Sequence, residues 1–307
     1  GNLSAQPAST YPTKPIKIIV GFSPGGSADA VGRSLAEAFS TRLGQPVIVE
    51  NRAGANGNIA AETVSRAAPD GYTLYFPSIG HAVNVSLYKN LPYDPIKDFT
   101  SIGGVFSAPN MLVVPMTSAY KTVPEIIAAA KANPGKLTFA SSGSGTSVHL
   151  SAELFQRMAG IQMIHIPYKG TGSALPDVIS GQVDMLFPNL PSALPQVKAG
   201  NLRGIAITTA KPSAAAPGMP TIAESGLPGY EMATWYGLVA PANLPIDIRN
   251  RLNKELQGIL ADPKFKDKLI AQGADSMPGT PEQFTAMLKF EIERWRKIIA
   301  QSKITIE

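Results

Sequence analysis

Two glycine-rich segments contain residues that could bind an anion. Residues 22–29 read Phe-Ser-Pro-Gly-Gly-Ser-Ala-Asp, and residues 140–147 read Ala-Ser-Ser-Gly-Ser-Gly-Thr-Ser. Each segment follows an apolar run and precedes a helical pattern. The first N–H groups of a helix have no partner within the helix, and the helix dipole adds partial positive charge there. The two segments therefore predict two sites where a carboxylate or phosphate is stabilised without Lys or Arg.

The two segments occupy the same position in two strand–helix repeats. Apolar runs predict strands at 16–20, 47–50 and 73–76 in the first repeat, with helices up to Leu43 and over 58–67. The second repeat has strands at 137–140, 163–166 and 183–187, with helices over 147–159 and 173–180. Strands that alternate with helices indicate an α/β fold with parallel strands, and a ligand is expected at their carboxyl ends.

The length of 307 residues and the order of the elements predict two domains. Apolar strands at 111–114 and 235–240 are expected to cross between them, and helices at 246–260, 263–272 and 281–302 are expected to pack on the first domain. We predict a discontinuous domain I over 11–113 plus 238–307, a domain II over 114–237, and a flexible segment over 1–10. Two βαβ-type domains joined by two crossing strands would form a clamshell that closes on a ligand.

The composition excludes several classes of protein. The chain has no cysteine, so disulfides, thiolate metal sites and a cysteine nucleophile are excluded. The formal charge of +5 comes from scattered Lys and Arg, which does not favour nucleic-acid binding. No apolar run is long enough to span a bilayer. The polar start has no signal-peptide pattern and is expected to be the trimmed start of an exported protein.

Nucleotide binding and catalysis find little support in the motifs. The first glycine segment has no Gly-Lys-Ser/Thr and no Gly-x-Gly-x-x-Gly, and Asp29 would repel a pyrophosphate. The three histidines, His81, His149 and His165, have no metal-ligand spacing, and no nucleophile elbow is present. We therefore expect no cofactor, no metal and no enzymatic activity. An α/β enzyme that uses His81 or His149 as a base remains the alternative.

Many ordered motifs of the chain are recognisable together. They include Gly-Phe-Ser-Pro-Gly-Gly-Ser-Ala-Asp, Asn-Arg-Ala-Gly-Ala-Asn-Gly-Asn-Ile, Ala-Ala-Pro-Asp-Gly-Tyr-Thr-Leu, Leu-Pro-Tyr-Asp-Pro, His-Ile-Pro-Tyr-Lys-Gly and Asn-Leu-Pro-Ser-Ala-Leu-Pro. From about Tyr11 onwards the chain resembles the Bug family, the periplasmic solute-binding receptors of tripartite tricarboxylate transporters. The resemblance implies a periplasmic-binding-protein-like clamshell that captures a small organic acid in the periplasm and delivers it to membrane permease subunits. We expect the receptor to be a monomer.

The resemblance also implies which residues contact the ligand. Mapped onto this chain, they are Phe22, Ser23, Gly26, Ser27 and Asp29 from the first domain, Ser142, Thr146 and Ser147 from the second, and Ser78, His81, Tyr168 and Asn189 from later loops. Two positions depart from the family pattern. Gly21 stands where many relatives have proline, and Pro188 where an acidic residue is common. Loss of that carboxylate disfavours an ammonium-bearing ligand, so we expect a mono- or dicarboxylate, aliphatic or aromatic. A receptor that reports to a signalling partner would need the same fold and remains an alternative.

Overall fold

The computed structural model describes residues 10–24, 27–302 and 304–305. The described residues form two compact units. Unit 1 lies within Gly1–Phe106, Trp235–Leu269 and Ser276–Lys297, and unit 2 within Ser107–Thr234, Ile270–Asp275 and Ile298–Glu307. This division differs from the predicted domains at both crossings. It also assigns two short C-terminal segments to unit 2. The predicted flexible segment over 1–10 lies, except for its last residue, outside the described residues.

Unit 1 is built on a parallel βαβαβ arrangement. Its first elements are β1 (Ile16–Val20), α1 (Ser27–Leu43), β2 (Val47–Asn51), a short 3-10 helix η1 (Ala55–Gly57), α2 (Asn58–Ser65), β3 (Thr73–Phe76) and α3 (Gly80–Leu87). The strand β1 pairs in parallel with both β2 and β3. With the later strands β4 (Phe99–Pro109), β9 (Ala233–Pro241) and β10 (Asp275–Ser276), the whole sheet has the order β10-β4-β9-β3-β1-β2. The predicted first repeat is therefore present, and the carboxyl ends of β1, β2 and β3 lie at one edge of the sheet.

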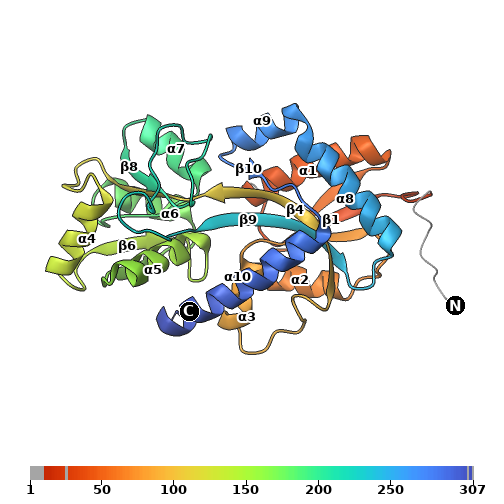
Figure 1. Cartoon of the computed structure of the whole chain (residues 1–307), viewed down its shortest axis with the longest axis horizontal. Helices are drawn as coiled ribbons and strands as arrows, with labels where there is room; N and C mark the ends of the chain where they lie inside the picture. The colour runs from red at the N-terminus through yellow and green to blue at the C-terminus, as the bar shows by residue number, and fades with distance from the viewer. Residues whose placement is uncertain (1–9, 25–26, 303, 306–307) are drawn as a thin grey trace. The chain divides into compact units, whose positions relative to one another are not determined.

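Helices cover the sheet of unit 1 on both sides. In Figure 1, α1 and α8 (Ile246–Ala261) lie side by side above the sheet, and α2 and α3 lie below it. Leu35 and Phe39 of α1 and Leu252 and Leu256 of α8 are fully buried, in keeping with the spacing of apolar residues that predicts these helices. Two more helices, α9 (Pro263–Ala271) and α10 (Pro281–Ser302), complete the C-terminal part.

The chain passes between the units within two long strands, β4 (Phe99–Pro109) and β9 (Ala233–Pro241), and again at the limits of the two short C-terminal segments of unit 2. The prediction that 111–114 makes the first crossing is wrong, because β5 (Met111–Pro115) lies entirely in unit 2. The sequence conceals β4, since Gly103 and Gly104 interrupt its apolar pattern. Space is tight at both glycines: a Cβ on Gly103 would lie 3.1 Å from Leu256, and one on Gly104 would lie 3.1 Å from Met277, so a larger residue would require these neighbours to shift.

Unit 2 contains two pairs of strands with helices around them. Its elements are β5, α4 (Val123–Ala132), β6 (Thr138–Ser141), α5 (Ser147–Ala159), β7 (Ile164–Pro167), α6 (Thr171–Ile179), α7 (Leu190–Lys198) and β8 (Leu202–Ile207). The strand β5 pairs antiparallel with β8, and β6 pairs parallel with β7. Buried Val113, Ala140, Val148, Val178 and Leu186 are part of its core.

The predicted strand at 183–187 is not a regular strand. Met185 forms a single parallel bridge with Phe139, and Leu186 forms a single antiparallel bridge with Val113. The segment therefore joins β6 to β5 through one residue on each side. The Asp184 carboxylate accepts the N–H of Thr138 at 2.8 Å, so a side chain takes the place of one ladder hydrogen bond.

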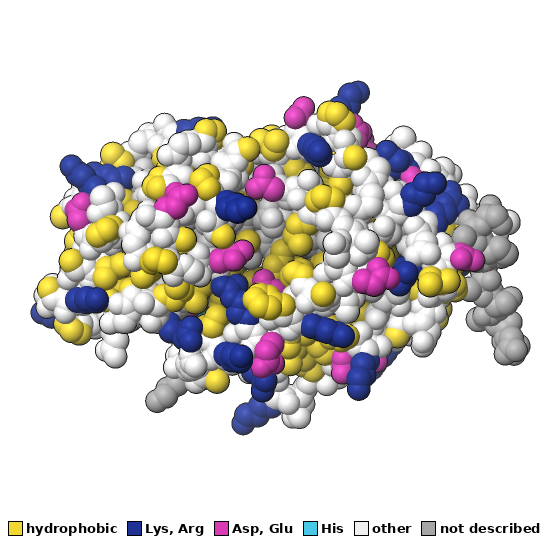
Figure 2. All heavy atoms as spheres, in the orientation of Figure 1, with side chains coloured by type: hydrophobic (Ala, Val, Ile, Leu, Met, Phe, Trp, Pro, Cys, Tyr) yellow, Lys and Arg dark blue, Asp and Glu magenta, His cyan; other side chains and the backbone are white. Residues whose placement is uncertain are grey.

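The described residues contain no helix that is long and apolar enough to cross a membrane. On the face shown in Figure 2, Lys and Arg side chains are interspersed with Asp and Glu. That face carries no continuous area of positive charge, as the scattered pattern in the sequence predicts.

Candidate functional site

The second glycine-rich segment forms a loop between β6 and α5 whose own hydrogen bonds fix its shape. Thr146 is the N-cap of α5, and its Oγ1 accepts the N–H of His149. The same hydroxyl donates to the Gly143 carbonyl at 2.7 Å and accepts from Ser142 Oγ at 3.0 Å. The Thr146 hydroxyl is thus occupied in capping. It is not available as a donor to a ligand, so the predicted ligand contact of Thr146 would need other atoms of the residue.

Several backbone N–H groups at this helix terminus remain available. Those of Gly143 and Gly145 donate to Ser141 Oγ and His149 Nδ1, and that of Thr146 donates to the Gly143 carbonyl. In the part of the chain that the structure describes, the N–H groups of Ser144, Ser147 and Val148 have no hydrogen-bond partner. Unpaired donors of this kind, together with the helix dipole, can stabilise an anion without a cationic side chain.

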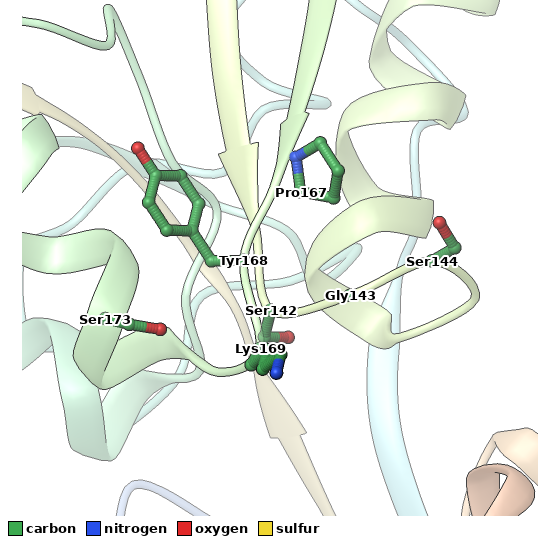
Figure 3. Close-up of a pocket in the computed structure, with 7 residues that line it drawn as sticks. All are labelled: Ser142, Gly143, Ser144, Pro167, Tyr168, Lys169 and Ser173. Atoms are coloured by element: carbon green, nitrogen blue, oxygen red, sulfur yellow. The ribbon is translucent and has the colours of Figure 1, made fainter. Parts of the chain in front are cut away.

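A pocket of about 760 Å³ lies beside this loop in unit 2 (Figure 3). It is lined by Ser142, Gly143, Ser144, Pro167, Tyr168, Lys169 and Ser173. The Tyr168 hydroxyl donates to the Asp177 carboxylate, and this hydrogen bond raises the pKa of Tyr168 to about 12. Tyr168 therefore stays protonated at neutral pH. Lys169 adds one positive charge to the pocket lining.

A buried polar network connects the start of α5 to Asn189. The Nδ2 group of Asn110 donates to Ser147 Oγ at 3.3 Å and to the Phe187 carbonyl at 2.9 Å. Ser147 Oγ in turn donates to Asn189 Oδ1 at 3.1 Å. The network brings together two predicted residues, Ser147 and Asn189. Asn110, fully buried at the end of a crossing strand, was not predicted, because a lone Asn between two apolar runs gives no signal in the sequence.

The first glycine-rich segment, in unit 1, is described only in part. Gly26 lies outside the described residues, and Ser27 begins α1 but its side chain is not described. Phe22 is half-buried and Ser23 is exposed. Gly21 is required by close packing, because a Cβ there would lie 2.9 Å from the Cα of Gly57. This contact accounts for a glycine where the family pattern has proline.

Asp29 has a positioning role in the first turn of α1. Its carboxylate is buried and accepts from Asn51 Nδ2 at 2.9 Å and from Arg33 Nε at 3.1 Å. Asn51 Nδ2 also donates to the Phe22 carbonyl at 3.0 Å. The cluster fastens the segment that follows β1 to the end of β2. Asn51 and Arg33 were not singled out from the sequence, because only the parallel pairing of β1 and β2 brings them to Asp29.

Ser78 and His81 follow β3, as predicted, and both are buried. The His81 ring is 2% exposed and packs among Tyr75, Tyr93 and Phe99. Its Nε2 lies 3.0 Å from the Pro95 carbonyl oxygen, and burial lowers the pKa of the ring to about 4. The ring thus faces the core of unit 1 and has almost no exposed surface for a ligand, which contradicts the expected orientation. Ser78 is bridged to Tyr236 through the backbone and stays a prediction.

Neither histidine named in the enzymatic alternative has an accessible basic nitrogen. His149 is 4% exposed, its Nδ1 accepts the Gly145 N–H, and its Nε2 lies 3.1 Å from Glu153 Oε1. His81 is buried as described above. Among the described residues no group of three or more His, Cys, Asp and Glu side chains is arranged to hold a metal ion.

Comparison with known proteins identifies the family. A sequence profile described as "Tripartite tricarboxylate transporter family receptor" matches residues 31–304. This chain belongs to that family. The R. palustris protein Rpa4515, solved with adipate, is 36% identical, with a TM-score of 0.87 over 97% of this chain and 100% of that one.

Two further solved structures are similar over nearly the whole chain. The periplasmic binding protein BugD is 33% identical, with a TM-score of 0.83 over 97% of this chain and 100% of that one. MatC from Rhodopseudomonas palustris, solved with bound malate, is 31% identical, with a TM-score of 0.81 over 94% and 100% of the two chains. The resemblance to the Bug family and the two-domain α/β fold of the periplasmic-binding-protein type are therefore confirmed. The chain is a solute-binding receptor of the tripartite tricarboxylate type.

Proposed function

We propose that this receptor binds a small mono- or dicarboxylate in the periplasm and delivers it to the permease subunits of a tripartite tricarboxylate transporter. The observation that supports this most directly is the set of N–H groups of Ser144, Ser147 and Val148 at the start of α5, beside the pocket of unit 2. A hydrogen bond to a charged group contributes about 1.5–3 kcal/mol. Three such bonds can hold a carboxylate at micromolar affinity after the cost of association.

The relatives and the remaining site residues agree with this ligand class. Two members of the family were solved with dicarboxylates, adipate and malate. In unit 2 the proposed ligand contacts are Ser142, Ser147, Tyr168 and Asn189, with Lys169 available to a second carboxylate. From unit 1 we propose Phe22, Ser23, Gly26, Ser27 and Ser78, with Asp29 as a residue that positions the first segment. We further propose that the receptor acts as a monomer, closes on its ligand and catalyses no reaction.

Thermal unfolding of the purified protein with a panel of compounds tests the proposal. The panel contains adipate, malate, benzoate, glutamate and ATP. At a ligand concentration about 100-fold above Kd, the stabilisation is about 2.7 kcal/mol, which raises Tm by several degrees. We expect at least one of the three plain carboxylates to raise Tm, and glutamate and ATP to have no effect. A rise in Tm with ATP and with none of the acids would overturn the proposal.

A further inference from the structure

The ligand loop of unit 2 rests on a cluster of three rings. His149 of α5 and His165 of β7 are parallel within 10°, with ring centroids 4.1 Å apart. Phe139 of β6 completes the cluster, with its centroid 5.0 Å from that of His165 and 6.4 Å from that of His149. His149 is buried and His165 is half-buried. No step of the proposed function uses either histidine, yet both lie next to the residues of the pocket loop.

Each histidine holds the backbone N–H of one loop glycine. The Gly145 N–H donates directly to His149 Nδ1 at 3.1 Å. The Gly143 N–H donates to Ser141 Oγ at 3.1 Å, and Ser141 Oγ lies 2.6 Å from His165 Nε2. Both glycines have positive φ, +127° for Gly143 and +83° for Gly145, so the chain turns sharply at each of them. The two contacts thus fix the loop at its two turns.

The Gly145 contact requires a neutral His149 ring with its proton on the other nitrogen, and the Ser141 contact is compatible with a neutral His165 ring. His149 Nδ1 accepts a proton donor, so its proton is on Nε2, from which it is donated to Glu153 Oε1 at 3.1 Å. Ser141 Oγ accepts from Gly143, and His165 Nε2 is the acceptor that the described structure offers to the Ser141 hydroxyl hydrogen. Burial and the neighbouring His149 lower the pKa of His165 to about 4, which keeps that ring neutral. Glu153 is the charged side chain that contacts the pair, since the neighbours from β6 are the uncharged Phe139 and Ser141.

We infer that His149 and His165 are positioning residues for ligand binding, which orient the loop so that the N–H groups of Ser144, Ser147 and Val148 point to the ligand. The identity of the ligand in this inference rests on the proposed function. The geometry of the loop does not depend on it. The loop uses an acceptor on His149 directly and one on His165 through the Ser141 hydroxyl. Removal of the His149 acceptor releases the Gly145 N–H, and removal of the His165 acceptor releases the hydroxyl that holds the Gly143 N–H, so that the turn at each glycine is less well fixed.

Paired substitutions separate the acceptor from the ring. His149→Asn keeps an acceptor close to the position of Nδ1, and His165→Gln keeps one close to Nε2. His149→Phe and His165→Phe keep the stacked ring and remove the acceptor. Ser141→Ala removes the hydroxyl between His165 and Gly143 without changing either ring, and it serves if a phenylalanine variant fails to fold. Circular dichroism and Tm verify the fold of each variant.

Adipate and malate affinities and amide hydrogen exchange give two independent measurements. We expect the two phenylalanine variants and Ser141→Ala to bind about tenfold more weakly than the wild type, and the Asn and Gln variants to stay within about threefold of it. Exchange at Gly145 should accelerate in His149→Phe and at Gly143 in Ser141→Ala and His165→Phe. In wild type, ring ¹⁵N shifts should show His149 protonated on Nε2.

The outcomes distinguish this inference from the proposed function. If the wild type binds neither acid nor any other carboxylate of the panel, the proposed function fails, and hydrogen exchange alone decides the positioning role. If the acids bind but the phenylalanine and Ser141→Ala variants bind as tightly as wild type, the inference is overturned. Equal losses in the phenylalanine and the Asn or Gln variants would also overturn it, because the ring and not the acceptor would then matter.

Discussion

At the scale of single residues, neighbouring side chains determine which atoms of Asn189 are available. Ser147 Oγ accepts from Asn110, so its own hydrogen goes to Asn189 Oδ1. This bond sets the orientation of the Asn189 amide and turns its Nδ2 group to the other side. In the part of the chain that the structure describes, Nδ2 makes no hydrogen bond. We propose that these two N–H donors contact the ligand carboxylate.

Asn189→Asp tests this donor without disturbing the network. The new carboxylate still accepts from Ser147, but it replaces two N–H donors by an oxygen and adds a negative charge. We expect carboxylate affinity, measured by titration calorimetry, to fall by more than about thirtyfold, since a lost hydrogen bond and charge repulsion together exceed about 2 kcal/mol. Asn201→Asp is the matched control, because exposed Asn201 bonds only to Gln196. Equal affinities in the two variants would exclude Asn189 from the site.

Residue roles were predictable from the sequence where the local pattern decides them. Thr146 and Ser147 stand at the start of an amphipathic helix, and the structure places them there. The orientation of His81 was not predictable, since α3 begins at Gly80 and turns the ring towards Tyr75 and Phe99. Those aromatic neighbours come from β3 and β4, and no sequence pattern shows that they surround one point.

At the scale of elements, the limits of a helix were predicted accurately where a capping residue marks each of its ends. Helix α5 has the predicted bounds because Thr146 caps its start and Gly160, with φ +66°, ends it. The long strand β4 was missed because its glycines hide the alternation. The segment 183–187 was predicted as a strand from its apolar composition, yet it pairs at only two residues. In that segment the Asp184 side chain makes one of the hydrogen bonds that a β-ladder would otherwise supply.

Asp184→Ala should therefore destabilise unit 2. Asp184 Oδ2 accepts the N–H of Thr138 at 2.8 Å and its hydroxyl at 3.2 Å, so the substitution leaves a half-buried N–H unpaired at the start of β6. We expect a loss of about 1–2 kcal/mol in the free energy of unfolding by urea. Asp184→Asn retains an oxygen acceptor and should lose less than half of that. An unchanged midpoint in Asp184→Ala would show that water replaces the carboxylate.

At the scale of the whole molecule, the proposed anion site depends little on the net charge of +5. The charged side chains on the face in Figure 2 are of both signs, and the donors proposed for the ligand are mostly backbone and amide N–H groups. Family membership was predictable from ordered motifs along the chain, and the profile match confirms it. The limits of the units were less predictable, because the crossing strand β4 and the short segments around β10 (Asp275–Ser276) are defined by contacts distant in sequence.

Each unit contains one histidine whose burial makes folding depend on pH. The pKa of His81 in unit 1 and that of His165 in unit 2 are both lowered to about 4 from the ordinary value of 6.5. The unfolded chain takes up these protons near pH 6.5, whereas the folded chain does so only near pH 4. Stability is therefore fully present above about pH 6.5 and is lost progressively as the pH falls towards about 4. For fully buried His81 the loss amounts to about 3 kcal/mol, and for half-buried His165 to less.

His81→Phe isolates this effect, because phenylalanine keeps an aromatic ring beside Tyr75, Tyr93 and Phe99 and cannot be protonated. Urea unfolding of the wild type and the variant is compared at pH values of about 7.0, 6.0, 5.0 and 4.5. These values cover most of the window between the pKa of His81 in the unfolded chain and that in the folded chain. Carboxylates other than Asp94, which interacts with the His81 ring, contribute equally to both proteins, so the difference between the two curves reports His81 and its coupling to Asp94. The variant should lose clearly less stability across the window than the wild type, whatever its stability at pH 7. Parallel curves would mean that the His81 ring is protonated as readily in the folded chain as in the unfolded one, and that it does not lie in the closed aromatic cluster beneath β3.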